Sequence, residues 1–360
     1  MCFAINNFCA GGAERVLSLI VNHYAANCNF ETHVICFEND AEYARFYPLN
    51  RKIKIHYINF NDAEEQLVQI LKEIKPDFVA SFLNPMNYVV SLATRKTHIP
   101  HVACERNNPL HSPDNETERR KRDEAFKEAA GCVFQTNLAA EYFRGKIHGI
   151  YKIIHNPVSI DAKYCDYQER QDKFVAVGRY AMQKNYPLLL ESFKQFTFIY
   201  PKYKLEIYGK DSGCFQQIAQ IVDSLSLNNN VSLNFETRQI HQHIRTAKAY
   251  ISTSLYEGIP NALSEAVALG IPCIATDIPG SHDILNKYNS GILVQANNPD
   301  EFISAMCRVQ SKNVFMELTR NREKILSENS VEIVATSFLE FFNSVVNKVR
   351  NKRIIIIKDI

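Results

Sequence analysis

Short apolar segments rich in β-branched residues alternate with helical patterns along almost the whole chain. In the helical segments the apolar residues recur every three or four positions. Over residues 13–26, for example, Val16, Leu17, Ile20 and Val21 fall on one face. Strands that alternate with helices form parallel sheets with helices on both faces. The pattern therefore predicts an α/β fold.

The predicted elements fall into two similar halves. In the first half, strands are expected at residues 2–6, 32–37, 54–60, 77–82, 101–105, 132–135 and 151–155, and helices at 13–26, 63–74, 86–95 and 114–129. In the second half, strands are expected at residues 174–177, 204–208, 231–235, 249–253, 272–276 and 291–294, and helices at 186–198, 214–226, 261–269 and 300–310. About twelve strands exceed what one open sheet usually carries. We therefore expect two doubly wound, Rossmann-like domains that face each other across a cleft.

The domain boundary is expected at Asn156-Pro157-Val158, where a proline ends the last strand of the first half and a charge-rich segment follows. This gives an N-terminal domain over residues 1–156 and a C-terminal domain over residues 157–330. A helix over residues 331–349 closes the second domain or crosses back to the first. In the tail, residues 350–360, four consecutive isoleucines indicate an edge strand or an exposed apolar end.

Composition narrows the class of protein. Of the 360 residues, 46% are hydrophobic, which suffices for two cores, and 41 basic against 39 acidic residues argue against a nucleic-acid binder. No apolar run is long enough to cross a membrane, and residues 1–12 do not resemble a secretory signal. Ten scattered cysteines without a C-x-x-C pair are typical of reduced thiols in a cytoplasmic protein.

Two glycine-containing loops follow predicted strands. Gly11-Gly12-Ala13-Glu14-Arg15 opens a helix, and a helix N-terminus presents N–H groups suited to phosphate. A plain turn is the alternative, and the motif is not the G-x-G-x-x-G of nicotinamide binders. The second loop begins at Gly178 and carries Arg179 and Lys184, a pair of cations that could hold a diphosphate or simply lie on the surface.

The most informative segment is Glu257-Gly258-Ile259-Pro260-Asn261-Ala262-Leu263-Ser264-Glu265, at a strand-loop-helix junction. We expect Asn261 to be the N-cap of the helix. One glutamate can then face a sugar and the other a ribose hydroxyl pair, unless both are merely solvated. The backbone N–H groups suited to phosphate oxygens are those of Asn261, Ala262 and Leu263. A later turn, Pro279-Gly280-Ser281, has Ser281 as its expected helix cap.

These motifs, with the linker His155-Asn156-Pro157-Val158, resemble in order and spacing the family-4 retaining glycosyltransferases of the two-Rossmann-domain, GT-B type. The resemblance spans residues 1 to about 345. The Gly-Gly-Ala-Glu-Arg motif is similar to that of bacterial members that extend lipid-linked oligosaccharides, capsules or O-antigens. The resemblance implies that the second domain binds a nucleotide-diphosphate sugar, most commonly a UDP-sugar. It also implies that the first domain binds a glycan or polyprenyl-diphosphate-linked acceptor.

The resemblance also assigns roles to residues. It implies that Arg179 and Lys184 neutralise the donor diphosphate, that Glu257 contacts the transferred sugar and that Glu265 holds the ribose. Arg179, Lys184 and Glu257 are thus the catalytic candidates. The remaining donor-binding candidates are Gly12, Ala13, Gly178, Asn261, Ala262, Leu263 and Glu265.

No metal and no cofactor are expected. Breaking a sugar–phosphate bond builds negative charge on the diphosphate, which must be stabilised as it develops. The sequence lacks the D-x-D pattern with which the other common transferase fold holds a divalent metal. Two cations and helix N-termini can take that role. The eleven histidines form no metal-binding pattern and are expected on the surface or in loops.

The acceptor side departs from the family pattern. Where many relatives carry a histidine, this strand ends in Cys104-Glu105-Arg106. Glu105 and Arg106 are candidate acceptor contacts, and Glu105 a candidate base, with a structural ion pair as the alternative. The densest basic cluster, Arg119-Arg120-Lys121-Arg122, lies on a predicted helix. It indicates either a solvated face or attraction to an anionic membrane surface, such as the inner face of the plasma membrane.

Two other functions stay open at this point. The first is a nucleotide-sugar epimerase or hydrolase of the same architecture, which would need further acids or bases beyond Glu257. The second is a non-catalytic partner subunit of a transferase. The presence of Arg179, Lys184, Glu257 and Glu265 together favours the transferase.

Overall fold

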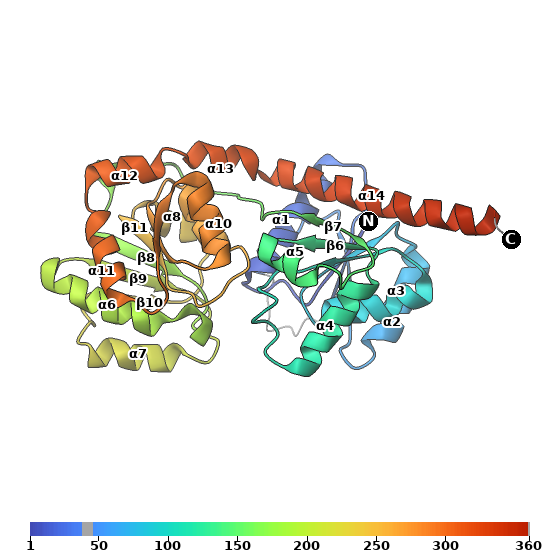
Figure 1. Cartoon of the computed structure of the whole chain (residues 1–360), viewed down its shortest axis with the longest axis horizontal. Helices are drawn as coiled ribbons and strands as arrows, with labels where there is room; N and C mark the ends of the chain where they lie inside the picture. Colours follow the sequence, from blue (N-terminus) through green and yellow to red (C-terminus); the bar gives the residue numbers. More distant parts are fainter. Residues whose placement is uncertain (38–45, 359–360) are drawn as a thin grey trace. The chain divides into compact units, whose positions relative to one another are not determined.

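The computed structural model describes residues 1–37 and 46–358 (Figure 1). The chain divides into two compact units, one formed by Met1–Pro157 with Val331–Ile360 and the other by Val158–Ser330. Each unit contains one sheet whose strands are all parallel. The predicted α/β class with two doubly wound sheets is confirmed.

The sheet of the first unit has the strand order β3-β2-β1-β4-β5-β6-β7 within the described residues. Its strands are β1 Cys2–Ile5, β2 His33–Phe37, β3 Lys54–Ile58, β4 Val79–Phe82, β5 His101–Cys104, β6 Gly131–Phe134 and β7 Ile150–Ile153. The helices between them are α1 Gly12–Asn27, α2 Ala63–Ile74, α3 Met86–Thr97, α4 Glu116–Glu128 and α5 Asn137–Phe143.

Side-chain alternation along β1 explains why helices cover both faces of this sheet. Phe3 and Ile5 enter a core with apolar residues of α1 and of the last helix. Cys2 and Ala4 point the other way, into a core with residues of α2 and α3. Because successive strand residues face opposite sides, a strand buried on both faces is apolar throughout, as β1 is.

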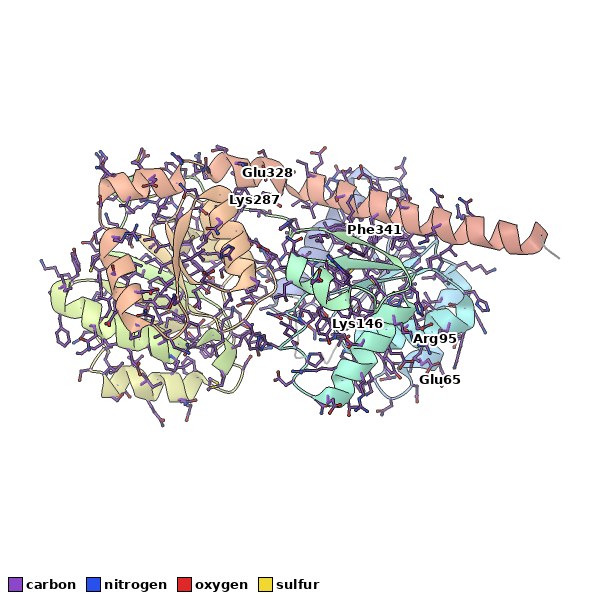
Figure 2. The ribbon with its side chains drawn as sticks, in the orientation of Figure 1. Glu65, Arg95, Lys146, Lys287, Glu328 and Phe341 are labelled. Carbon is purple, nitrogen blue, oxygen red and sulfur yellow. The ribbon has the colours of Figure 1, made fainter. Side chains whose placement is uncertain are left out.

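The last helix, α14 Val331–Lys358, packs on the first unit. Phe342 stacks on Phe78 at 4.4 Å, and the hydroxyl of Tyr24 donates to the carbonyl of Ala335 at 2.6 Å. Figure 2 labels Phe341 on the same stretch of helix.

The predicted end of this helix was wrong, because its backbone stays helical to Lys358 and residues 354–357 form neither an edge strand nor an irregular tail. Isoleucine costs only a few tenths of a kcal/mol in a helix. No glycine or proline interrupts residues 331–358.

The second unit has the strand order β10-β9-β8-β11-β12-β13. Its strands are β8 Lys173–Val177, β9 Lys204–Tyr208, β10 Val231–Asn234, β11 Ala249–Ser252, β12 Cys273–Thr276 and β13 Gly291–Val294. Its helices are the short 3-10 turns η1 Tyr167–Glu169 and η2 Met182–Lys184, followed by α6 Tyr186–Ile199, α7 Phe215–Ser224, α8 Ile240–Arg245, α9 Asn261–Ala268, α10 Pro279–Tyr288, α11 Pro299–Arg308, α12 Lys312–Thr319 and α13 Arg322–Glu328.

The chain leaves the second unit through a tightly bonded segment. Lys287 of α10 pairs with Glu328 of α13 at 2.8 Å (Figure 2). Asn329 donates from Nδ2 to the Tyr288 hydroxyl at 2.7 Å and accepts from the backbone N–H of Val158 at 2.7 Å. The start and the end of the second unit are therefore tied to each other within that unit.

Candidate functional site

The strand order of the second unit places two of the predicted loops side by side. β9 and β10 lie in turn on one side of β8, whereas β11, β12 and β13 lie in turn on its other side. Ligands of doubly wound sheets bind at the carboxyl ends of strands where the order reverses. β8 and β11 are paired neighbours, so the loops that follow them, with Lys184 and Glu257, meet at this point.

Lys184 and Glu257 form an ion pair between Nζ and Oε1. Only 17% of the lysine side chain and 14% of the glutamate side chain are exposed. Ser254 also donates its hydroxyl to Oε1 of Glu257 at 2.9 Å, and Thr253 donates its hydroxyl to the carbonyl of Lys184 at 2.8 Å. Both charged groups are therefore held in place at the carboxyl edge of the sheet.

Gly178 makes room for this lysine. A Cβ at position 178 would lie 2.5 Å from Cε and 2.8 Å from Cδ of Lys184. The carbonyl of Gly178 accepts a hydrogen bond from the hydroxyl of Tyr186 at 2.7 Å, which fixes the loop from the other side. A larger residue at position 178 would therefore require the side chain of Lys184 to shift.

Arg179 is exposed and reaches the same region through Gln183. Its Nη2 donates to Oε1 of Gln183 at 3.2 Å, and Nε2 of Gln183 donates to the carbonyl of Tyr256 at 2.6 Å. The loops after β8 and β11 are further joined by the backbone N–H of Leu255, which donates to the carbonyl of Gln183 at 2.8 Å. The exposed guanidinium can thus meet a solvent-borne anion beside the Lys184–Glu257 pair.

The helix α9 begins at Asn261, and Pro260 is its N-cap, so the prediction of Asn261 as the cap was wrong. The extended conformation of Pro260 already satisfies the geometry of a cap. The first helical bond runs from the Ser264 N–H to the Pro260 carbonyl at 3.1 Å. The backbone N–H groups of Asn261, Ala262 and Leu263 therefore lie in the first turn, where a helix favours an anion.

Glu265 lies one turn further along α9 and is only 5% exposed. Its Oε2 lies 3.0 Å from Nε2 of His241, a residue of α8 that is 3% exposed. The expectation that the histidines lie on the surface or in loops was wrong for His241. It was also wrong for His101, a buried strand residue whose pKa burial lowers to about 3.

A close backbone contact joins the Glu257 loop to the next helix. The carbonyl oxygen of Gly258 lies where a Cβ of residue 280 would be, so only glycine fits at that position. α10 begins at Pro279 with Ile278 as N-cap, so the prediction of Ser281 as the cap was wrong. Proline at the first helical position already has the helical φ, and the helix starts three residues earlier than predicted.

In the first unit the order reverses between β1 and β4. Nδ2 of Asn6, after β1, donates to the carbonyl of Asn84, after β4, at 3.1 Å. α1 begins at Gly12, with Ala13 buried and Gly11 in extended conformation before it. The carboxylate of Glu14 folds over Gly11, so an acidic side chain lies at the start of this helix.

Glu105 follows β5 and is 3% exposed. Its Oε1 accepts from the backbone N–H groups of Arg106 at 2.9 Å and Asn107 at 3.0 Å, whereas its buried Oε2 has no hydrogen-bond partner in the described structure. Burial raises the pKa of Glu105 to about 7, although the two N–H groups and Arg122 act in the opposite direction. This carboxyl group can therefore exchange a proton near neutral pH.

Arg106 is also buried, and burial lowers its pKa to about 10. Its Nη2 donates to Oδ1 of Asn156, and its guanidinium lies 5.5 Å from the ring centre of Phe82. Gln135 donates to the same oxygen of Asn156 at 2.5 Å. The structure thus places Arg106 among interior side chains that join β4, β6 and the end of the unit.

The basic cluster on α4 is not a uniform cationic face. Arg122 is fully buried and donates to the carbonyls of Pro109 at 2.8 Å and Ser112 at 2.6 Å. Arg120 pairs with Glu116 and Lys121 with Glu118 along the helix. The helix carries five cations and five acids in all. Attraction to an anionic membrane surface stays a prediction.

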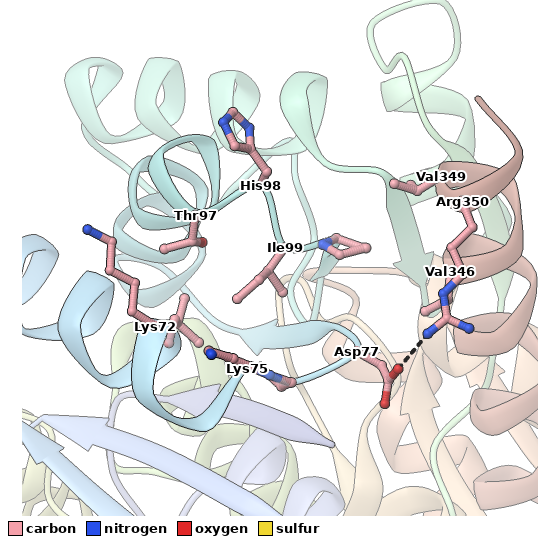
Figure 3. A pocket seen from close by; sticks show the side chains of 12 residues that line it. Lys72, Lys75, Asp77, Thr97, His98, Ile99, Val346, Val349 and Arg350 are labelled. Carbon is pink, nitrogen blue, oxygen red and sulfur yellow. Dashed lines mark hydrogen bonds and ion pairs between the residues drawn. The ribbon is translucent and has the colours of Figure 1, made fainter. Parts of the chain in front are cut away.

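The first unit contains a cavity of about 460 Å³, which lies away from the loops at the carboxyl ends of its strands. It is lined by the ends of α2 and α3 and by α14, and the ion pair of Asp77 with Arg350, at 2.8 Å, lies at its edge (Figure 3). Asp77 and Pro100 come just before β4 and β5, so the cavity is at the amino ends of the strands. Ligands of such sheets bind at the opposite ends, and we assign no substrate to it.

The described residues contain neither a metal-binding cluster nor a membrane-spanning helix. Over residues 1–37 and 46–358, no three histidine, cysteine, aspartate or glutamate side chains are grouped so as to hold a metal ion. Within the same residues, no helix has the length and apolar character needed to cross a membrane.

The chain is similar to known glycosyltransferases. Residues 166–329 match the family model described as "Glycosyl transferases group 1". The chain is 28% identical over 385 residues to UDP-Gal:alpha-D-GlcNAc-diphosphoundecaprenol alpha-1,3-galactosyltransferase of Escherichia coli, covering 94% of this chain and 95% of the relative. An uncharacterized glycosyltransferase of Methanocaldococcus jannaschii is 26% identical over 247 residues, which cover 61% of this chain and 60% of that relative.

Solved structures share the fold over nearly the whole chain. The crystal structure of HepE from Anabaena, in complex with UDP and glucose, matches with a TM-score of 0.80 at 16% identity. The match covers 95% of this chain and 99% of HepE. The chain therefore has the GT-B fold of these structures, and the match over residues 166–329 supports a glycosyltransferase. More narrowly, residues 166–329 are similar to group 1 glycosyltransferases, and the chain is similar to a bacterial galactosyltransferase whose named acceptor is diphosphoundecaprenol-linked.

Proposed function

We propose that the chain is a retaining hexosyltransferase that moves a sugar from a nucleotide-diphosphate sugar to a glycan or polyprenyl-diphosphate-linked acceptor. The observation that carries this proposal is the Lys184–Glu257 pair at the carboxyl edge of the second sheet, with the exposed Arg179 beside it. The name of the Escherichia coli relative, which includes UDP-galactose and a diphosphoundecaprenol acceptor, supports UDP as the nucleotide. It also supports a role in capsule, O-antigen or related polysaccharide synthesis.

The residues divide the chemical work as follows. The bond between sugar C1 and the diphosphate oxygen breaks, and the charge that develops on that oxygen is met by Lys184 and Arg179. The first turn of α9 adds backbone N–H groups for the phosphate oxygens. Glu257 holds Lys184 and presents its carboxylate to the sugar, while Glu265 accepts from the ribose hydroxyls. The acceptor oxygen bonds to C1 on the face that the diphosphate leaves, and its proton passes to a donor phosphate oxygen.

We propose that this chemistry needs no metal ion and no other cofactor. A divalent metal in such reactions neutralises the leaving diphosphate. Here a lysine fixed by an ion pair and an exposed arginine supply positive charge next to a helix N-terminus. The proposal predicts full transfer in the presence of EDTA.

The acceptor binds to the first unit in this proposal, near Glu105. A carboxyl group whose pKa lies at about 7 can donate to or accept from an acceptor hydroxyl at neutral pH. Gly12 and Ala13 begin a helix whose N-terminal N–H groups are suited to phosphate, and we propose them as further donor-binding residues. A lipid-linked acceptor would bring the cytoplasmic enzyme to the inner face of the plasma membrane. We propose no nucleic-acid partner. Flotation of the protein with liposomes of anionic or neutral lipid tests its attraction to an anionic membrane surface. Equal flotation with both kinds of liposome would contradict that attraction.

A panel of nucleotide-diphosphate sugars tests the function directly. Thermal unfolding with UDP-, GDP- and ADP-sugars in EDTA identifies the donor by its stabilisation of the chain. Incubation of that donor with a diphosphoundecaprenol-linked sugar should then give a longer glycan with the anomeric configuration of the donor. Epimer or free sugar formed rapidly from the donor alone would favour the epimerase or hydrolase. Donor binding without any turnover would favour the non-catalytic subunit.

A further inference from the structure

The second glutamate of the donor site is held by a buried histidine that the reaction itself does not require. Nε2 of His241 lies 3.0 Å from Oε2 of Glu265. The two side chains are 4% and 6% exposed, so water does not screen this contact. A buried carboxylate is costly unless it is paired and hydrogen bonded, and the imidazole N–H meets part of that need.

The other face of the imidazole is fixed by Asp161. Nδ1 of His241 lies 2.5 Å from Oδ1 of Asp161 and 3.2 Å from its backbone nitrogen. In the neutral ring, Nδ1 accepts from the Asp161 N–H, and in the charged ring it donates to the Asp161 carboxylate. Since an ionised carboxylate only accepts, the contact with ionised Glu265 requires the proton on Nε2, which then donates to it.

We propose that His241 is a positioning residue that sets the orientation of Glu265 for the ribose of the donor, and that Asp161 fixes the imidazole for this purpose. Anchoring Oε2 fixes the plane of the carboxylate and hence the direction of Oε1. A vicinal diol donates two hydrogen bonds in a set direction, so it gains from an acceptor that is already oriented. The inference rests on the proposed function, because it takes Glu265 as the ribose contact.

The geometry distinguishes this arrangement from a metal site. Asp161 and Glu265 approach opposite nitrogens of one ring, so the three side chains do not converge on a common point. Asp161 is 65% exposed and belongs to the segment that opens the second unit. The ribose contact is therefore linked through one imidazole to the start of that unit.

Binding of UDP and of 2′-deoxy-UDP to the full-length chain tests the inference. His241→Leu should weaken UDP binding about tenfold and leave 2′-deoxy-UDP binding within twofold, since that ligand lacks one of the two hydroxyls that need the oriented carboxylate. In transfer assays the KM for the donor should rise while kcat stays within twofold, because the ribose contact is made equally before and during reaction. His241→Gln should recover most of the affinity, because its Nε2 can donate to Glu265.

A matched control lies on the same helix. Nδ1 of His243, a residue whose side chain is 39% exposed, lies 2.8 Å from the Tyr208 hydroxyl. His243→Leu should therefore change the affinity for neither UDP nor 2′-deoxy-UDP. If His241→Leu lost equal affinity for both ligands, or no affinity for either, the role of His241 would be overturned while the proposed function would stand. A wild-type chain that binds none of UDP, GDP and ADP would overturn the proposed function, and this inference with it. Unfolding curves of each variant show whether it is folded.

Discussion

Lys184 and Glu257 form a half-buried ion pair although 73 residues separate them in sequence. Each residue follows one of the two neighbouring strands between which the strand order of the second sheet reverses. The pair brings a fixed positive charge and a fixed carboxylate to the edge where ligands of such sheets bind.

We expect Lys184→Ala to lower the turnover of the donor about 100-fold or more, because the leaving diphosphate loses a fixed positive charge. Steady-state transfer with saturating donor measures the effect. Lys202→Ala, an exposed lysine of the same unit, serves as the control and should leave the rate unchanged. Near wild-type turnover in Lys184→Ala would refute the role given to this lysine.

Gly280→Ala tests the backbone contact behind the Glu257 loop. The added methyl group would meet the carbonyl oxygen of Gly258, so the loop must shift. We expect a loss of about 1–3 kcal/mol in unfolding free energy, together with slower transfer. Ser281→Ala is the neighbouring control: its hydroxyl is buried without a hydrogen-bond partner in the described structure, and removing it should not destabilise the chain. Equal stability of the two variants would contradict the contact.

The protonation of Glu105 should make stability depend on pH. In the unfolded chain this glutamate loses its proton at its ordinary pKa of 4.5, whereas in the folded chain it keeps the proton up to a pKa of about 7. The folded state therefore binds more protons between these values, so stability falls as pH rises from 4.5 to 7 and then levels off. The change is at most about 3 kcal/mol.

Glu105→Gln keeps an oxygen for the two backbone N–H groups but has no proton to lose. Urea unfolding at pH 5.5 and pH 8 should show a smaller decline for this variant than for the wild type. Glu116→Gln, at a position whose side chain is 79% exposed, should keep the wild-type decline. A wild-type slope in Glu105→Gln would show that another group titrates.

Arg122→Ala should destabilise the first unit rather than alter lipid binding. The buried guanidinium donates to two carbonyls and, through Nη2, to the Tyr142 hydroxyl at 2.6 Å. Removing one partner of such a buried charged group costs roughly 3–5 kcal/mol. Arg120→Ala, at a position 79% exposed, should stay within about 0.5 kcal/mol of wild type. Hydrogen exchange in α4 and α5 reports the difference, and similar exchange in both variants would disprove it.

Much of the fold follows from periodicity. Helix α2 and strands β9 and β13 have the predicted bounds, because their apolar patterns are clear and bounded by polar or turn residues. Helix α5 was not predicted, and neither were α8, α12 and α13, which are all eight residues or shorter. So short a helix shows barely two turns of the pattern, and its stability comes from tertiary packing.

The candidate site could be predicted only as a set of loops. That Lys184 and Glu257 follow strands was visible in sequence, but their contact depends on which strands pair. Burial of His241 was missed because H-x-H spacing gives no helical face. A signal available in the sequence was that His241 lies shortly before the apolar strand predicted at residues 249–253. Burial of Glu105 depends on three-dimensional packing and left no mark in the local pattern.

The return of α14 to the first unit bears on how the protein is made. Val334, Phe338 and Phe342 complete a core whose other members lie mainly among the first 154 residues. During synthesis these early segments leave the ribosome long before the residues that cover them, and the second unit, which is continuous in sequence, emerges in between. A chain broken off after Ser330 would therefore keep a whole second unit and expose the apolar surface of the half that was translated first.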